Sequence, residues 1–384
     1  MAKFAKGNYR KPTGYVRVRL GKRNTRELST SREIDDELWS ILDYYSEIDS
    51  IGLDFIKNSG IKNASTKKRI FKHFRSHIRQ AKGFYFSAKI LPVSSSPLLY
   101  YYSFMNLAMA RLVIEDPSII NKKLSHGLSY KLKIKKLPFK KQSIKVHKEG
   151  VFPLLYNWYF NKNLSIEQIN ISSLFNYCTD ISYECDITGI KENKILYCKY
   201  SNCVNHNNKT SWPLIAIYNA NEILKYPKMF KSFMSYFEKV KLNQDDYKKI
   251  FNISPIYSEG ISFFQGPTKN WISNNFPAFN EVCDEVIDIL GNTLQFNYTS
   301  KDLDYYLTLP YKINKQISLD ETISIYLIMF YLSNLVRYNP RYIDYLLDKK
   351  ESWLINIFIK SCTITFLRCI VSRIININYV FRKL

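Results

Sequence analysis

Apolar side chains recur at helical spacing in two neighbouring stretches of the N-terminal half. In residues 65–87 they lie three or four positions apart, which is the period of a helix with one buried face. Residues 97–114, PLLYYYSFMNLAMARLVI, are apolar almost throughout, as in a helix packed on several neighbours. Ser65 and Ser96 are the expected N-caps, and Pro97 suits a first helical turn.

A third apolar helix is expected at residues 319–338. Ser318 and Glu321 have the spacing of a capping box, and Pro340 marks the end of the helix. The helices of residues 97–115 and 319–338 are therefore the best candidates for a shared core. This core is expected to bury Tyr101, Phe104, Met105, Ala108 and Leu112 against residues such as Leu327, Phe330, Leu332 and Leu335.

The remaining segments predict a predominantly α chain with a smaller α+β region. An acidic helix at 33–58 could lie against the basic N-terminus, and the lysine-rich residues 127–149 read as a hairpin. The expected organisation is a basic N-terminal arm (1–32), a helical region (33–126), a mixed α+β region (127–300), and a C-terminal helical region (301–384) that packs on residues 60–120.

None of the apolar stretches predicts a membrane span. The stretch 97–114 would cover roughly 27 Å, which is marginal for a bilayer, and it contains Arg111. The N-terminus carries cations and no apolar signal segment, and seven cysteines at irregular spacing suggest reduced thiols. We therefore expect a cytoplasmic protein that does not bind membranes.

The formal net charge of +23 changes the functional picture. The abundance of Lys, Asn, Ile, Tyr and Phe is typical of an AT-rich genome, so the lysine content alone is weak evidence. The positions of the cations are more informative. Residues 1–32 hold ten Lys or Arg and only Glu27 as an acid, and residues 55–114 hold eleven Lys or Arg and no acid. Such asymmetry indicates a surface that faces a polyanion.

Two basic segments are the candidate nucleic-acid contacts. In the helix of residues 65–87, five cations repeat at spacings of four and three on a face distinct from the apolar one. In residues 14–26, arginines alternate with apolar residues as on one face of a short strand. The candidates are the ridge of Lys68, Lys72, Arg75, Arg79 and Lys82 and the arm of Arg17, Arg19, Lys22 and Arg23, which should converge on one surface. A solvated helix face and a disordered tail are the structural alternatives.

Three short motifs resemble a known family. They are SSSPLLYYYSFMNLAMARLVI, then LSHGLSY, and much later SIYLIMFYLSNLVRYNPRY. In this order they resemble the bacterial YaaC-like family, with its PLLxYY-type helix, HGL motif and LSxxxRYxP-type motif, over roughly residues 65–384. The resemblance implies a fold more than a function, and it does not extend to the basic arm.

A more remote resemblance to the helical HEPN superfamily implies a HEPN-like helical core with the hairpin as an insertion. Many members of that superfamily are ribonucleases or antiviral effectors, and their usual signature is an Arg followed four to six residues later by a His. This chain lacks that signature. The remaining catalytic candidates are His126, Arg337 and Asn339, and we expect His126 and Arg337 to approach one another.

Other chemistry has less support. No GxGxxG or GxxxxGK[ST] pattern is present, and no cofactor is expected. Cys198, Cys203 and His206 could ligate a metal ion, but their spacing matches no standard zinc module, and cysteines in a loop are the better interpretation.

The sequence therefore leaves function hypotheses from different classes. One is a nucleic-acid-binding protein that contacts RNA or DNA, such as an RNA-directed effector in bacterial antiviral defence. Another is a non-catalytic helical scaffold or subunit with a protein partner or a second copy of itself. A third is an enzyme that uses His126 and Arg337 on a phosphorylated small molecule, so an enzymatic role stays open.

Overall fold

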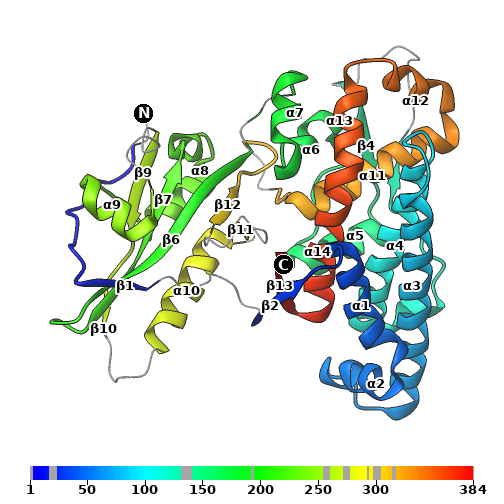
Figure 1. The fold of residues 1–384 in the computed structure, drawn as a ribbon, viewed down its shortest axis with the longest axis horizontal. Coiled ribbons are helices and arrows are strands. Elements are labelled where there is room, and N and C mark those ends of the chain that lie inside the picture. Colours follow the sequence, from blue (N-terminus) through cyan, green and yellow to red (C-terminus); the bar gives the residue numbers. More distant parts are fainter. Residues whose placement is uncertain are drawn as a thin grey trace. The chain divides into compact units, whose positions relative to one another are not determined.

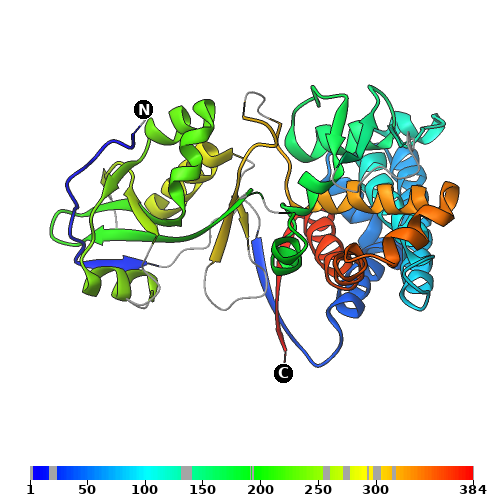
Figure 2. The same cartoon turned by 90° about the horizontal axis from the view of Figure 1, so that it is seen from above.

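The computed structural model describes residues 3–16, 24–130, 141–190, 192, 194–253, 260–270, 277–291, 294–296, 304–313 and 317–383 (Figures 1 and 2). The chain divides into two compact units, and each is described by itself. The sheet unit comprises Met1–Asn24 and Asn193–Asp320, and the helical unit comprises Thr25–Glu192 and Glu321–Leu384. The helical unit is therefore made of two chain segments, one before and one after residues 193–320 of the sheet unit.

The helical unit contains most of the predicted long helices. Its main helices are α1 (Ile34–Glu47), α2 (Asp49–Asn58), α3 (Ala64–Lys89), α4 (Ser96–Glu115), α5 (Val151–Phe160), α11 (Glu321–Tyr338), α12 (Pro340–Leu347), α13 (Glu351–Ile357) and α14 (Thr363–Ile375). Shorter helical segments are η1 (Pro117–Asn121), α6 (Ile171–Phe175), η3 (Thr179–Ile181), α7 (Ser182–Ile187) and the π-helical turn η7 (Phe358–Cys362).

The strands of the helical unit are short. β3 (Leu128–Ser129), β4 (Ser143–Val146) and β5 (Gln168–Asn170) form an antiparallel sheet, and β2 (Asn24–Thr30) pairs with β13 (Ile377–Lys383). The pairing of β3 with β4 confirms the hairpin predicted for residues 127–149 at its described ends. The residues 127–192 belong to the helical unit, not to a mixed region that continues to residue 300.

The expected core of α4 and α11 is confirmed. Tyr101, Phe104, Ala108 and Leu112 are buried, although Met105 is only half-buried. Tyr101 contacts the rings of Tyr326 and Phe330 at centroid distances of 5.6 and 5.3 Å. The residues expected on α11, which are Leu327, Phe330, Leu332 and Leu335, are likewise buried. The C-terminal helices therefore pack on residues 60–120 as predicted.

Several local expectations are corrected. The acidic segment 33–58 forms two helices that break at Ile48, and α1 packs on α3 and α14. At the start of α1, Glu37 also pairs with Arg32, the last cation of the basic segment 1–32, at 2.7 Å. The N-cap of α3 is Asn63, whose side chain accepts a hydrogen bond from the backbone N–H of Thr66 at 3.0 Å. An asparagine two positions earlier therefore takes the N-cap position that was expected for Ser65. Glu321 begins α11, close to the predicted start at residue 319, and its carboxylate also accepts hydrogen bonds from Thr179.

The sheet unit is built on an antiparallel sheet with helices on both faces. The strand order is β11 (Leu294–Phe296), β12 (Asp304–Thr308), β6 (Ile195–Asn205), β7 (Thr210–Tyr218), β9 (Ile261–Gln265) and β8 (Glu238–Val240). β1 (Gly14–Val16) also pairs with β6, and β10 (Lys269–Asn270) with β7. The helices are η4 (Ala220–Lys225), α8 (Pro227–Met234), α9 (Gln244–Phe251) and α10 (Pro277–Leu290).

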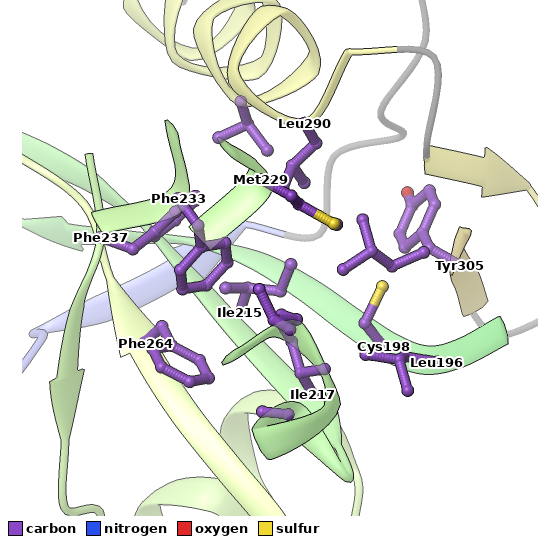
Figure 3. Packing of buried hydrophobic residues seen from close by; sticks show 14 of the residues in the cluster. Leu196, Cys198, Ile215, Ile217, Met229, Phe233, Phe237, Phe264, Leu290 and Tyr305 are labelled. Carbon is purple, nitrogen blue, oxygen red and sulfur yellow. The ribbon is translucent and has the colours of Figure 1, made fainter. Parts of the chain in front are cut away.

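Side chains alternate between the two faces of the sheet along each strand, and an apolar layer lies on each face. Even-numbered residues of β6, such as Cys198, pack with α8 and α10, as Figure 3 shows for Met229, Phe233 and Leu290. Cys203 faces the other layer, which contains residues of α9. Successive side chains of a strand point to opposite faces, so each strand contributes to both layers.

Among the described residues, length and composition alone would allow one helix, Glu351–Ile375, to cross a membrane, but two thirds of its most apolar window is buried inside the protein. The core helix of a soluble protein gives the same result, so this is weak evidence for a span.

Candidate functional site

The HGL motif forms a tight loop that positions His126. Gly127 and Gly150 both have positive φ angles, of +72° and +125°. A Cβ atom on Gly127 would lie 2.4 Å from Cδ of Pro153, and one on Gly150 would lie 2.4 Å from Cα of Gly127. Only glycine fits at these two positions, because the two backbone segments touch. The carbonyl of His126 also accepts a hydrogen bond from the N–H of Phe152 at 3.1 Å, which fixes the loop to the start of α5.

Consecutive tyrosines of α4 bind the two candidate residues. The hydroxyl of Tyr101 lies 2.9 Å from Nδ1 of His126, and Nη1 of Arg337 donates to the hydroxyl of Tyr102 at 2.9 Å. Arg337 lies near the end of α11, more than 200 residues after His126 in the sequence. The structure therefore brings together the two residues that were expected to approach one another.

The electrostatics of this cluster favour a neutral imidazole. Burial lowers the pKa of His126, and the nearby positive charge of Arg337 lowers it further. Burial also raises the pKa of Tyr101 well above its usual value, so the phenol keeps its proton. A neutral imidazole has one nitrogen that can accept a proton or a hydrogen bond. Beside it, the exposed guanidinium of Arg337 can bind an anion such as a phosphate. We call Tyr101, Tyr102, His126 and Arg337 the His–Arg cluster.

The third candidate, Asn339, has a structural role in the backbone. It occupies the N-cap position of α12, and its carbonyl accepts a hydrogen bond from the N–H of Tyr342 at 2.9 Å. Its backbone N–H also donates to the carbonyl of Leu335 at 2.9 Å. Asn339 thus connects α11 to α12 at the corner that presents Arg337.

Replacing Arg337 by glutamine is expected to raise the pKa of His126. The substitution removes the positive charge that disfavours the imidazolium, whereas burial of the ring remains. Histidine NMR titration of both proteins would measure the change. Arg111→Gln is the matched control, since Arg111 lies on α4 but pairs with Glu115. Equal pKa values of His126 in wild type and Arg337→Gln would contradict the proximity of the two charges.

The basic ridge of α3 is largely neutralised from within the protein. Acidic residues of α1 and of the start of α2 lie opposite its cations in antiparallel register. Lys82 pairs with Asp43 at 2.7 Å, Arg79 with Glu47 at 2.6 Å, and Arg75 with Asp49. The acids that α3 lacks are therefore supplied by α1 and α2. Arg79, in turn, lowers the pKa of Glu47 through its hydrogen bond and charge.

The first half of α3 is different. Lys68, Arg69 and Lys72 are exposed, and they form no ion pair with any residue that the structure describes. The candidate arm residues Arg17, Arg19, Lys22 and Arg23 lie outside the described residues. The convergence of arm and ridge on one surface therefore stays a prediction.

The weak metal candidates are not brought together. Cys198 and Cys203 are both buried, but they face the two different apolar layers of the sheet unit. His206 is exposed after the end of β6. No group of three or more His, Cys, Asp or Glu residues suited to a metal ion occurs in the described part of the chain.

Two polar networks, one largely buried and one partly buried, were not foreseen from the sequence. The side chain of Gln142 bonds with the hydroxyls of Tyr130, Tyr331 and Tyr342. Elsewhere, Glu321 accepts two hydrogen bonds from Thr179 at 2.7 Å, and Thr365 donates to Asp180. The members of each network come from distant segments, so neither has a local sequence signature. The abundance of tyrosine among the apolar residues of the helices is the one feature of the sequence that points to buried hydroxyl groups in need of partners.

Comparisons with known proteins give one match. The family model described as YaaC-like Protein matches residues 52–374, which include α3, α4, the HGL loop and α11. No curated protein and no solved structure matches the chain. The acidic helix α1 precedes the matched range, although the cations that it neutralises lie within it. Since the match covers more than four fifths of the 384 residues, this chain belongs to the YaaC-like protein family.

Proposed function

We propose that this protein binds nucleic acid through the cations of α3 that no carboxylate neutralises. The supporting observation is the contrast along one helix. Arg75, Arg79 and Lys82 are paired with acids of α1 and α2, whereas Lys68 and Lys72 are exposed without an ion pair among the described residues. Unpaired cations in a row repel one another, and phosphate groups relieve that repulsion.

The wider role that we propose is an RNA-directed effector or subunit in bacterial antiviral defence, with a HEPN-like helical core. This rests on the resemblance of the sequence to that superfamily. The juxtaposition of His126 and Arg337 is compatible with contact to a phosphate group, because a guanidinium binds phosphate and a neutral imidazole can exchange a proton. The arm of Arg17, Arg19, Lys22 and Arg23 would extend the contact surface.

The second candidate function is a non-catalytic scaffold or subunit. Its support is the ion pairing between α1 and α3, because a basic face that is neutralised internally needs no polyanion. In that case the remaining positive charge would serve an acidic protein partner or reflect genome composition.

Loss of Lys68 and Lys72 is expected to weaken nucleic-acid binding and its salt dependence. Each phosphate contact contributes about 0.7 to 0.9 to the slope of log affinity against log salt, so Lys68→Ala with Lys72→Ala should lower the slope by about 1.5. The affinities of wild type and variant for RNA and DNA of equal length would be measured over a salt series.

The matched control is Arg79→Ala with Lys82→Ala, which removes the same charge from the same helix at ion-paired positions. This pair should change the slope much less. Circular dichroism would establish that both variants fold. If the two double variants changed the salt slope equally, binding would depend only on the total charge of the protein. If the wild-type protein did not bind nucleic acid, the scaffold function would be favoured.

A further inference from the structure

The corner between α11 and α12 carries two exposed tyrosines. Tyr338, the last residue of α11, is 62 % exposed, and Tyr345 on α12 is 47 % exposed. The chain turns between them at Asn339 and Pro340. From Pro340 to Tyr345 the helix rises by about 7.5 Å, so the two residues lie within a short stretch of this corner. Large aromatic side chains at exposed positions are typical of binding surfaces.

Each of these rings has a cation beside it. The Cζ atom of Arg337 lies 5.1 Å from the ring centroid of Tyr338, and Nζ of Lys349 lies 5.2 Å from that of Tyr345. Arg341, also exposed, forms no ion pair among the residues that the structure describes. The acids of this corner are Asp344, Asp348 and Glu351, whose charge acts on Tyr342, and the cations are Arg337, Arg341, Lys349 and Lys350. The corner therefore combines aromatic faces with a net positive charge.

The side chains behind this surface are held in place. Tyr345 stacks on Tyr342 at a centroid distance of 5.8 Å and an interplanar angle of 30°. The hydroxyl of Tyr342 accepts a hydrogen bond from the buried amide of Gln142. On the other side of the corner, Arg337 is fixed by its hydrogen bond to Tyr102. A ligand therefore meets groups whose side-chain freedom is already reduced, which favours affinity.

We propose that Tyr338 and Tyr345 form a stacking platform for the bases of a single-stranded nucleic acid, whose phosphates contact Arg337 and Arg341. This rests on the proposed nucleic-acid binding and specifies its ligand. Bases of a single strand expose their faces and stack on aromatic side chains, whereas the bases of a duplex are already stacked on one another. The adjoining His–Arg cluster would then lie beside the backbone of the bound strand.

The test compares three oligonucleotides of equal length, which are a uridine RNA, an abasic strand with the same phosphates, and an RNA duplex. Tyr338→Ala is expected to weaken binding of the uridine RNA about tenfold, because one base–aromatic stack contributes roughly that factor. Binding of the abasic strand should be unchanged. Tyr338→Phe keeps the aromatic face and should bind the uridine RNA as wild type does. Tyr183→Ala is the matched control, since Tyr183 is 65 % exposed but packs on Trp353.

The outcomes separate this platform from the proposed function. Equal affinity of wild type and Tyr338→Ala for the uridine RNA overturns the platform while leaving phosphate-based binding in place. An equal loss for the abasic strand also overturns it, because the residue would then act without a base. Wild-type protein that binds none of the three oligonucleotides overturns both the proposed function and the platform.

Discussion

Replacing Phe104 by alanine is expected to lower the free energy of unfolding of the helical unit by about 3–5 kcal/mol. Phe104 is fully buried on α4, and its ring stacks on Phe366 of α14 with a centroid distance of 3.8 Å. Truncation removes the ring from the core and leaves a cavity that helices on both sides can fill only in part. Urea unfolding followed by circular dichroism would measure the change.

Met105→Ala is the matched control for this prediction. Met105 is the next residue of the same helix but is only half-buried, so its truncation should cost much less. Equal losses for the two variants would show that the loss does not depend on how deeply the truncated side chain is buried. A wild-type midpoint for Phe104→Ala would contradict the packing of α4 against α14.

The free energy of unfolding is expected to depend on pH through Glu321. Burial, and secondly the charge of Asp180, raises the pKa of Glu321 from its usual 4.5 to about 7. The folded state therefore binds a proton that the unfolded state has already lost between these values. The resulting stability is fully present below pH 4.5 and is lost as pH rises through about 7.

Glu321→Gln should remove this contribution. The amide oxygen of glutamine can still accept the two hydrogen bonds that Thr179 donates, but it does not ionise. The difference in free energy of unfolding between variant and wild type should therefore move in favour of the variant as pH rises from 5 to 8. Chemical unfolding at a series of pH values would measure this difference.

Glu47→Gln provides a control of opposite sign. The hydrogen bond and charge of Arg79 lower the pKa of Glu47, so its contribution is present at neutral pH and is lost as pH falls. A difference between wild type and Glu321→Gln that stays constant with pH would mean that Glu321 ionises normally in the folded protein.

The long helices could be predicted because their information is local. The apolar period of α3 and the continuous apolar character of α4 and α11 identify these elements and their buried residues without any knowledge of partners. The first and last residues of a helix are harder to predict, because several neighbouring side chains can act as its cap. In α3 the N-cap is Asn63 and not Ser65. The HGL and RYNP motifs also led to the prediction that His126 and Arg337 approach one another, and the charge of Arg337 does act on His126.

The electrostatic state of the ridge could not be predicted in the same way. The cations of α3 are regular within the helix, but Asp43, Glu47 and Asp49 neutralise them from segments that lie about thirty residues earlier. Only the packing of α1 and α2 on α3 determines this register. In contrast, the separation of Cys198 from Cys203 follows from strand parity, since an odd spacing places two residues on opposite faces.

The interrupted sequence of the helical unit has a consequence for its synthesis. Residues 25–192 leave the ribosome before residues 193–320, and only then does α11 become available to cover α4. At about 5–20 residues per second, translation of the intervening segment takes roughly 6 to 26 seconds. During this interval the face of α4 that carries Tyr101 has no α11 to pack against, so the nascent chain presents an apolar surface to which chaperones can bind.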